Sequence, residues 1–570
     1  MTHAIAAPAD RADRADQTGP AGLEARLGDP LDPANPLGHA AVVAADERGE
    51  ILAAGEEMLD ACGLNAEFVP RSLGGRFERA DRLAETVRAV FRRDVTLGLG
   101  YGITNFVAAA PVWASGDAGQ RAWLARLLLG NRRAAAAYTE LRHGNDFTRN
   151  ELTALPAAPG FVVDGRKELV NNAERADAVV LFARTGDGPG SRSHSHLLVD
   201  MTALPAGRRR YLPRFPTAGV RGCLLGGIEF AGCPVPGDAL LGERGGAMET
   251  VLKAFQVTRA VLPGVVVGAL DTQLRTALSF AGRRVLYGGT VADLPNARSA
   301  LAGAFLDLLV CDALSTVGAR ALHLCPAETS VLTAAVKYLV PKILREASYD
   351  LSVLVGARSY LREGPYAIFE KMMRDLPLVT FAHANAAVCQ ATIIPQLPRL
   401  AARGWPRAEP PPDALFDLGA GLPPLDFGRL AINARGADGL SAMLAVAADD
   451  ADPRVAASAA RLAAELARLR RRCRDLPARD RTVLASRAAF DLCERYIVLL
   501  AAAACIGVRR NGTGFRAEPD WLVGALARLE ARLGRRERVP ADIEARLTAE
   551  LSARFDDHLT FDLYARRLAG

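Results

Sequence analysis

The stretch "VPGDALLGERGGAMETVLKAFQVTRAVLPGVVVGAL" (residues 235–270) contains the boundary between two kinds of sequence pattern. Before it lie short β-branched segments separated by Gly, Pro and Asp: residues 160–170, 177–185, 194–201 and 222–235. Such segments are typical of strands joined by turns. From Gly246 to about Gln396, apolar residues recur at helical spacing. The stretch therefore predicts a small β domain, residues 137–245, followed by a helical domain, residues 246–398.

Outside these two domains the patterns are helical or irregular. Residues 39–136 repeat apolar side chains at helical spacing, so we expect an N-terminal helical domain. Residues 1–38 lack this periodicity, and we expect a mobile tail there. Residues 399–428 are rich in Pro and Gly and predict a linker, and residues 429–570 predict a C-terminal helical extension. The fold class expected is mainly α with a central small β domain.

Composition narrows the class of protein. The 570 residues are 50% hydrophobic and 24% charged, which indicates a globular chain with a large core. The net charge of +6 comes without a basic strip interleaved with aromatic residues, so no nucleic-acid partner is expected. The longest apolar run, residues 496–508, is shorter than a bilayer span, and the N-terminus lacks the apolar core of a signal peptide. We expect a cytoplasmic protein with no membrane partner.

The cysteines and short motifs offer few candidates on their own. None of the nine cysteines lies two residues from another, so no metal site is predicted and reduced thiols are expected. "GLGYGIT" (98–104) has glycines as in a dinucleotide loop, but no strand precedes it, so we interpret it as a flexible helix junction. "YTELRHGND" (138–146) directly precedes the β domain; alone it is an ordinary turn.

In combination the motifs carry more information. "YTELRHGND", residues 235–270, "RRVLYGG" (283–289) and "VGARSYLREGPYAIFEKMMRD" (355–375) follow one another within a helical–β–helical order. Together they resemble the acyl-CoA dehydrogenase and acyl-CoA oxidase superfamily, over roughly residues 40–398. The C-terminal helical block also resembles the extension of the oxidases, although no motif there matches.

The resemblance implies a flavoprotein. In that family FAD lies between the β domain and the second helical domain, and its ring faces an acyl thioester. The thioester is expected on CoA or on an acyl-carrier protein. Family precedent also implies a homodimer or homotetramer.

Several residues match family positions. For the cofactor, Thr139 matches the threonine that hydrogen-bonds the flavin, and Arg284 matches the arginine on the FAD pyrophosphate, a role suited to its planar fork. Asn171 stands where the family has the threonine of a tryptophan–isoleucine–threonine stretch, and Gly356 is one of the paired positions near the adenine. For the substrate, Asn145 replaces the serine of "GSD" and Arg259 matches an arginine near the substrate.

His383 stands eight residues after Asp375, where active family members carry a glutamate. That glutamate removes the α-proton of the thioester while a hydride leaves the β-carbon. The second family position for a carboxylate is Thr258, which is no base. We therefore expect His383 as the catalytic base, since its unperturbed pKa of about 6.5 leaves much of it neutral near pH 7. The alternatives are a residue that only shapes the pocket, or an alignment that is wrong by one or two residues.

These observations leave three functions open. The first is flavin-dependent α,β-dehydrogenation of an acyl thioester, in a specialised biosynthetic pathway because the pocket residues are altered. The second keeps the fold and the flavin but uses O2 as a monooxygenase. The third is a flavin-free descendant that binds acyl groups or catalyses a non-redox step.

Overall fold

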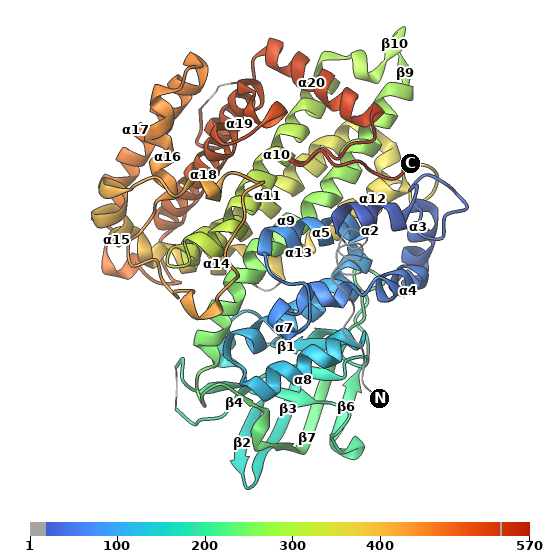
Figure 1. The fold of residues 1–570 in the computed structure, drawn as a ribbon, viewed down its shortest axis with the longest axis vertical. Coiled ribbons are helices and arrows are strands. Elements are labelled where there is room, and N and C mark those ends of the chain that lie inside the picture. The colour runs from blue at the N-terminus through green and yellow to red at the C-terminus, as the bar shows by residue number, and fades with distance from the viewer. Residues whose placement is uncertain (1–18, 189, 383, 536–537) are drawn as a thin grey trace.

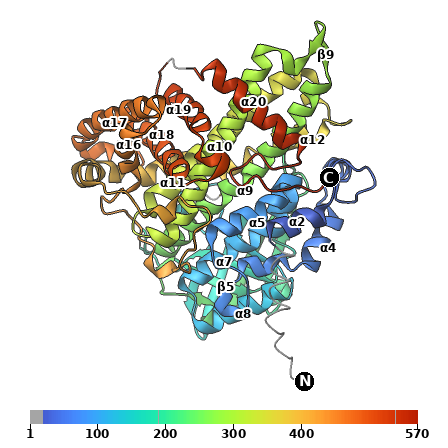
Figure 2. The same ribbon diagram turned by 45° about the horizontal axis from the view of Figure 1, so that its top comes forward.

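The computed structural model describes residues 19–188, 190–382, 384–535 and 538–570. The sheet lies at one end of the molecule, and long helices extend from it toward the other end (Figure 1). In both views the blue N-terminal helices and the orange helices of the C-terminal extension lie on opposite sides of these long helices, while the dark red end of the chain crosses back toward the N-terminal helices (Figure 2). The expected helical–β–helical order with a C-terminal extension is confirmed.

The N-terminal helices begin earlier than the sequence pattern indicates. They are α2 (Pro20–Leu27), α3 (His39–Arg48), α4 (Ala53–Ala61), α5 (Ala80–Arg93), α6 (Val95–Leu97), α7 (Thr104–Ser115) and α8 (Ala118–Leu129). The expectation of a mobile tail to residue 38 is wrong for α2, which starts at a proline and buries Leu23 and Leu27 against α5. These leucines are four residues apart and share one helix face. Glu24, on the same helix, forms an ion pair with the buried Arg92.

The β domain is a mixed sheet with its own hydrophobic core. Its strands are β1 (Ala134–Ala137), β2 (Thr153–Ala157), β3 (Gly160–Asn171), β4 (Ala178–Arg184), β5 (His194–Asp200), β6 (Arg209–Leu212), β7 (Leu225–Pro236) and β8 (Leu240–Leu241). The strand order is β6-β7-β3-β2-β4-β5-β8, and β1 pairs with β4 in parallel. The sheet therefore begins at Ala134, before the expected boundary at residue 137. Its inward side chains form a cluster separate from the helical core.

A bundle of long helices forms the centre of the molecule. The second helical domain comprises α9 (Ala247–Arg283), α10 (Pro295–Leu324), α11 (Thr329–Val355), α12 (Ala367–Asp375), α13 (Leu378–Phe381), α14 (Ala386–Ile393) and α15 (Leu397–Arg399), with the short hairpin β9 (Val285–Leu286) and β10 (Gly289–Thr290). Helix α9 packs against α5, α10 and α11. Its Gly268 permits the closest approach, because a Cβ there would lie 2.7 Å from the carbonyl oxygen of Arg88 on α5.

The C-terminal extension packs on α10 and α11. Its helices are α16 (Met443–Val446), α17 (Pro453–Arg474), α18 (Arg487–Arg510), α19 (Pro519–Arg532) and α20 (Ala541–Asp556). The expected linker, residues 399–428, is also packed: Arg320 of α10 donates hydrogen bonds to the carbonyl oxygens of Ala414 and Leu415. His323, one turn later, bonds the carbonyl oxygen of Pro423 at 2.8 Å. This segment thus covers α10 instead of spanning free space.

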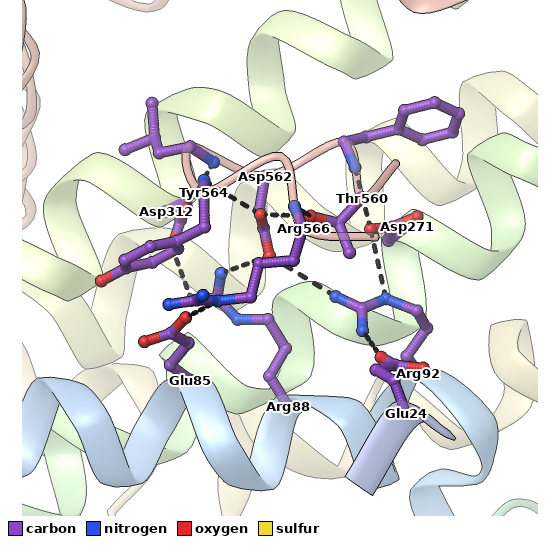
Figure 3. A network of polar contacts seen from close by, with 12 residues as sticks. Glu24, Glu85, Arg88, Arg92, Asp271, Asp312, Thr560, Asp562, Tyr564 and Arg566 are labelled. Carbon is purple, nitrogen blue, oxygen red and sulfur yellow. Dashed lines mark hydrogen bonds and ion pairs between the residues drawn. The ribbon is translucent and has the colours of Figure 1, made fainter. Parts of the chain in front are cut away.

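The last residues return to the N-terminal domain through a buried polar network (Figure 3). Asp562 accepts hydrogen bonds from Arg88 at 2.9 Å and from Arg92 at 3.4 Å, both on α5. Arg88 also donates to Asp312 of α10, and this carboxylate accepts from the amide of Leu563 at 2.9 Å. The two arginines hold the pKa of Asp562 at about 2, despite the opposing effect of burial. The network ties the end of the chain to α5 and α10 by charge.

Four stretches of the described residues are long and apolar enough to cross a membrane, judged by length and composition alone. We expected no apolar stretch long enough to span a bilayer, because residues 496–508 form the longest apolar run in the sequence; these four helices are longer. In three of them, Val95–Ser115, Ala247–Arg283 and Pro295–Leu324, 89 to 94% of the apolar window is buried inside the molecule. The fourth, Ala367–Arg407, is 35% buried. The apolar surface of the first three is accounted for by packing within the bundle.

Candidate functional site

The loop that follows β1 is held in place by a buried ion pair. The carboxylate of Glu140 accepts hydrogen bonds from the ammonium of Lys167 at 2.8 Å and from the amides of Glu151 and Leu152. Neighbouring Thr139 is anchored through its backbone, whose carbonyl accepts from the Glu168 amide at 2.8 Å. Thr139 is half-buried, and its hydroxyl forms no hydrogen bond within the described part of the chain. The loop thus presents the Thr139 side chain from a fixed backbone.

Aromatic contacts join this loop to the first half of α9. The ring of Phe255 lies 5.9 Å from that of Tyr138 and 6.1 Å from that of Phe147, centre to centre. Arg259 follows Phe255 by one helical turn and lies over its ring at 5.7 Å. Asn145 is half-buried in the same loop. The structure therefore places the predicted residues Thr139, Asn145 and Arg259 in one region, between the β domain and α9.

Asn171 ends β3 beside the helical run α6–α7. Its Nδ2 donates to the Thr104 hydroxyl at 2.7 Å, while its Oδ1 is buried without a partner. Nearby Leu169 has a φ of +54° and is 39% exposed. A leucine in this conformation is strained, and an orphaned buried acceptor is uncommon. Both features suit a surface that a bound cofactor covers, so this edge fits the predicted role of Asn171.

The "GLGYGIT" stretch lies on the other side of this contact. It forms a π-helical turn, Gly98–Ile103, inside a continuous helix and not a flexible junction. The carbonyl oxygen of Gly100 accepts a hydrogen bond from Asn172 at 2.5 Å. Such π turns are frequent at functional sites. Thr104 is a residue of this site that our sequence analysis missed, and the glycine-rich stretch before it was the available signal.

The segment that carries the predicted base is described on both sides of His383, and His383 itself lies outside the described residues. Before it, the carbonyl oxygen of Val379 accepts a hydrogen bond from Lys337 of α11 at 2.6 Å. After it, Ala384 has a φ of +108°, a conformation that residues other than glycine rarely adopt. Asn385 then caps α14 through its side chain. A strained residue held between two fixed contacts is typical of functional segments.

Two cations lie buried beside this segment. Arg259 is 3% exposed and Lys337 is 2% exposed. Burial, reinforced by the positive charge of Arg259, lowers the pKa of the Lys337 ammonium to about 8. Burial also lowers the pKa of Arg259 and raises that of the Cys389 thiol, which lies near both cations. Thr258 is buried and bonds the Phe255 carbonyl, so it supplies no carboxylate here. Lys337 was not predicted from the sequence, where it lies within an apolar helical pattern.

Two predicted cofactor residues are not brought to this region. Arg284 follows the last residue of α9 and is exposed. It is 25 residues beyond Arg259 along one helix, which corresponds to about 37 Å. Gly356 ends α11 with a φ of +65° and is also exposed. Strand β9, which begins directly after Arg284, lies at the end of the molecule away from the β domain (Figures 1 and 2). Within one chain they cannot join the site that contains Thr139 and Asn171.

A surface pocket adjoins the outer side of the Thr139 loop. It has a volume of about 440 Å³ and is lined by His143, Arg149, Glu151 and Arg184, among others. Arg184 is fixed from behind, because its guanidinium donates to the Asn150 and Thr148 carbonyl oxygens. The pocket therefore offers two arginines next to the predicted site.

Comparisons with known proteins find similar families over the same part of the chain. Residues 135–233 match the family described as acyl-CoA dehydrogenase, middle domain, and residues 245–394 match acyl-CoA dehydrogenase, C-terminal domain. The two matches cover most of the sheet and the helices α9 to α14. They include Arg259, Arg284 and Lys337.

Individual relatives are distant. The chain is 26% identical to the mitochondrial short-chain specific acyl-CoA dehydrogenase of Homo sapiens over 235 residues. This alignment covers 41% of this chain and 56% of that protein. The chain is 28% identical over 268 residues to the acyl-CoA dehydrogenase apdG of Emericella nidulans, covering 45% of this chain and 60% of that protein. The chain thus spans little more than half of each of these relatives.

Solved structures share the fold. Butyryl-CoA dehydrogenase from Megasphaera elsdenii superimposes with a TM-score of 0.58 at 18% identity, over 68% of this chain and 97% of that one. PigA, solved with FAD and proline, superimposes with a TM-score of 0.60 at 17% identity, over 70% of this chain and 99% of that one. Residues 135–233 and 245–394 thus resemble the middle and C-terminal domains of acyl-CoA dehydrogenases, and the solved structures show that the chain shares their fold.

Proposed function

We propose that the protein is an FAD-dependent oxidoreductase that dehydrogenates an acyl thioester between its α and β carbons. The observation that carries this proposal is the packing of the Thr139 loop against Phe255 of α9, beside Arg259. Lys337, which lies near Arg259, bonds the Val379 carbonyl on the segment that leads to residue 383. The superfamily match supports the flavin chemistry in general. The altered pocket supports a specialised biosynthetic substrate instead of bulk fatty-acid oxidation.

The residues that would hold FAD are those with unused polar groups. The Thr139 hydroxyl and the orphaned Oδ1 of Asn171 would contact the flavin. Bound FAD supplies a two-electron acceptor for the hydride that leaves the β-carbon. Arg259 and the loop around Asn145 would orient the thioester beside it.

The proton is the part of the reaction that this chain's side chains must handle. We assign its removal from the α-carbon to His383, because Thr258 cannot accept a proton. A histidine base becomes a cation, and the buried charges of Arg259 and Lys337 oppose that change. We therefore expect a base that works better as pH rises through the histidine range.

Anaerobic mixing with acyl thioesters tests this reaction. The holoprotein should lose its visible flavin absorbance on mixing with a thioester of suitable chain length, and His383→Ala should slow that loss at least 100-fold. His558→Asn, which changes an exposed histidine, should keep the wild-type rate. An unchanged bleaching rate in His383→Ala would show that His383 is not the base that removes the α-proton.

A second function is favoured by one observation. No carboxylate occupies either family position, since one is Thr258 and the other is His383. An O2-dependent monooxygenase needs no carboxylate base for an α-proton. Consumption of O2 that depends on added NADPH and a reductase, without flavin bleaching by thioesters, would support this alternative over dehydrogenation.

The carrier of the thioester and the compartment are also proposals. The arginines of the surface pocket, Arg149 and Arg184, would bind a phosphate of the thioester carrier. That carrier is either CoA or the phosphopantetheine of an acyl-carrier protein. The nine cysteines are unpaired, which is compatible with the cytoplasm that we propose.

We propose further that the working form is a homodimer or a homotetramer, because Arg284 lies too far from Thr139 to serve the same flavin. Exposed apolar side chains lie close to Arg284 and Gly356 in the sequence: Val285, Tyr287, Val353, Tyr360 and Leu361. Exposed apolar side chains of this kind suit contact with a second copy of the chain. Arg284 of one protomer would then reach the flavin of its partner.

Mixing two defective variants tests this arrangement. Thr139→Ala and Arg284→Ala should each bind FAD poorly. Mixed oligomers should regain about one flavin for every two chains, because half of their sites combine an intact Thr139 with an intact Arg284. No recovery in verified mixed oligomers would contradict the shared site.

A further inference from the structure

Among the described residues, seven of the ten buried lysines and arginines pair with a carboxylate. Lys371 pairs with Asp94 at 2.6 Å and with Asp375 at 2.7 Å, and Lys167 pairs with Glu140 at 2.8 Å. The same holds for Arg88 and its two aspartates. Arg93 follows another route, since its guanidinium donates to the backbone carbonyl oxygens of residues 27, 28 and 37. The fold therefore compensates buried positive charge in these places.

Arg259 and Lys337 depart from this rule. Within residues 19–188, 190–382, 384–535 and 538–570, neither forms an ion pair with a carboxylate, and Arg259 forms no hydrogen bond. Its Nε is fully buried without a partner. Lys337 donates a single hydrogen bond, to the Val379 carbonyl, although an ammonium has three donors. Two cations with several free donors thus lie in the interior.

The neighbouring side chains Cys389 and Thr258 do not supply a negative charge to these two cations. Cys389 of α14 lies near both cations, but burial raises the pKa of its thiol and keeps it neutral. Thr258 bonds the backbone of its own helix. An unpaired buried charge costs several kcal/mol, and a guanidinium cannot escape this cost by losing its proton near neutral pH. The free energy is recovered if an anion binds between the two cations.

We propose that Arg259 and Lys337 form a binding site for a carboxylate carried by the acyl chain of the substrate. This inference rests on the proposed function, which places the acyl group beside α9, and it adds the substrate class: the thioester of a dicarboxylic acid. The guanidinium fork can bind both oxygens of a carboxylate, and the ammonium adds a second charge. A carrier phosphate remains at the protein surface, whereas this site is at most 3% exposed.

The test compares two thioesters of equal length on the FAD-loaded protein. Titration calorimetry at pH 7 should give about tenfold or tighter binding of glutaryl-CoA relative to pentanoyl-CoA. Lys337→Gln keeps a donor for Val379 but removes the charge, and it should bring this ratio close to one. Arg259→Gln should do the same. Arg345→Gln removes an exposed charge from α11 and should leave the preference intact.

Free anions separate this inference from the proposed function. Glutarate should raise the unfolding temperature of the wild type and of Arg345→Gln, but not of Lys337→Gln, even if no thioester binds. Equal binding of the two thioesters, or a preference that survives in Lys337→Gln, would overturn the inference. It would also fall if inorganic phosphate stabilised the protein as much as glutarate, since the site would then bind an adventitious ion only. If Arg259→Gln does not fold, the Lys337→Gln comparison decides the matter.

Discussion

Lys337 illustrates how the fold sets the chemistry of single residues. In the sequence it is one lysine in an apolar helix, with no partner at helical spacing. In the structure it is buried, faces Arg259 of α9 and Cys389 of α14, and bonds the segment that leads to residue 383. Its lowered pKa follows from these tertiary neighbours, and no local sequence pattern encodes them.

Stability should depend on pH through this lysine. Its pKa is about 8 in the folded chain against an ordinary 10.5, so between these values the unfolded chain binds the extra proton. The free energy of unfolding of the wild type should therefore rise by about 2 to 3 kcal/mol from pH 7 to pH 10 relative to Lys337→Met. Urea unfolding at several pH values measures this difference. Arg345→Gln controls for net charge, and a difference that stays constant with pH would contradict the assignment.

The candidate site was predictable only in part at this scale. Thr139, Asn145 and Arg259 were found because they lie in recognisable motifs, and the structure brings them together. Arg284 and Gly356 lie in motifs as well, yet the length of α9 separates them from Thr139. Thr104 ends the glycine-rich stretch 98–104, which we interpreted as a helix junction, and Lys337 belongs to no motif; both reach the site through tertiary packing.

At the scale of elements, packing between α5 and α9 is set by one glycine. Any side chain at Gly268 would meet backbone atoms of α5, with a Cβ 2.7 Å from the Arg88 oxygen and 2.9 Å from the Arg92 nitrogen. Because backbone atoms cannot rotate away, the helices would have to separate. This contact also fixes the two arginines that bind the C-terminal segment.

Substitution of this glycine should therefore be costly. Gly268→Ala should lower the free energy of unfolding by about 2 kcal/mol or more through overpacking. Gly282→Ala is the matched control, because a Cβ at Gly282 on the same helix meets nothing within 4 Å. That change should stabilise the helix by about 0.5 to 1 kcal/mol. Similar stabilities for the two variants in chemical unfolding would refute this account of the contact.

The order of elements was predictable because strand and helix periodicities differ sharply on either side of Gly246. Helix α2 was missed, since eight residues with two buried leucines give too short a pattern to recognise. The packed state of residues 399–428 was missed for a related reason. Proline and glycine mark irregular backbone, but they do not reveal that Arg320 binds that backbone.

At the scale of the whole molecule, the chain is closed by charges far apart in sequence. Arg88 and Asp562 are separated by 474 residues, and both are buried. Together with Asp312 they join the first helical domain, the central bundle and the end of the chain (Figure 3). Sequence patterns describe neighbours along the chain, so no such pattern predicts this closure.

Breaking the closure should destabilise the protein strongly. Asp562→Asn leaves Arg92 with one fewer carboxylate and Arg88 with Asp312 alone, which should cost about 3 kcal/mol or more of unfolding free energy. Asp557→Asn removes an exposed carboxylate from the same segment and should have little effect. Thermal and urea unfolding of both variants measure the difference. Equal stability of the two would show that the network contributes little.

The central claim is that this scaffold binds FAD and uses it. The most direct measurement is the visible absorbance spectrum of the freshly purified protein, followed by mass identification and quantification of the cofactor released on heating. The account predicts a flavin spectrum and close to one FAD per chain. A colourless protein that remains colourless after incubation with excess FAD would contradict it.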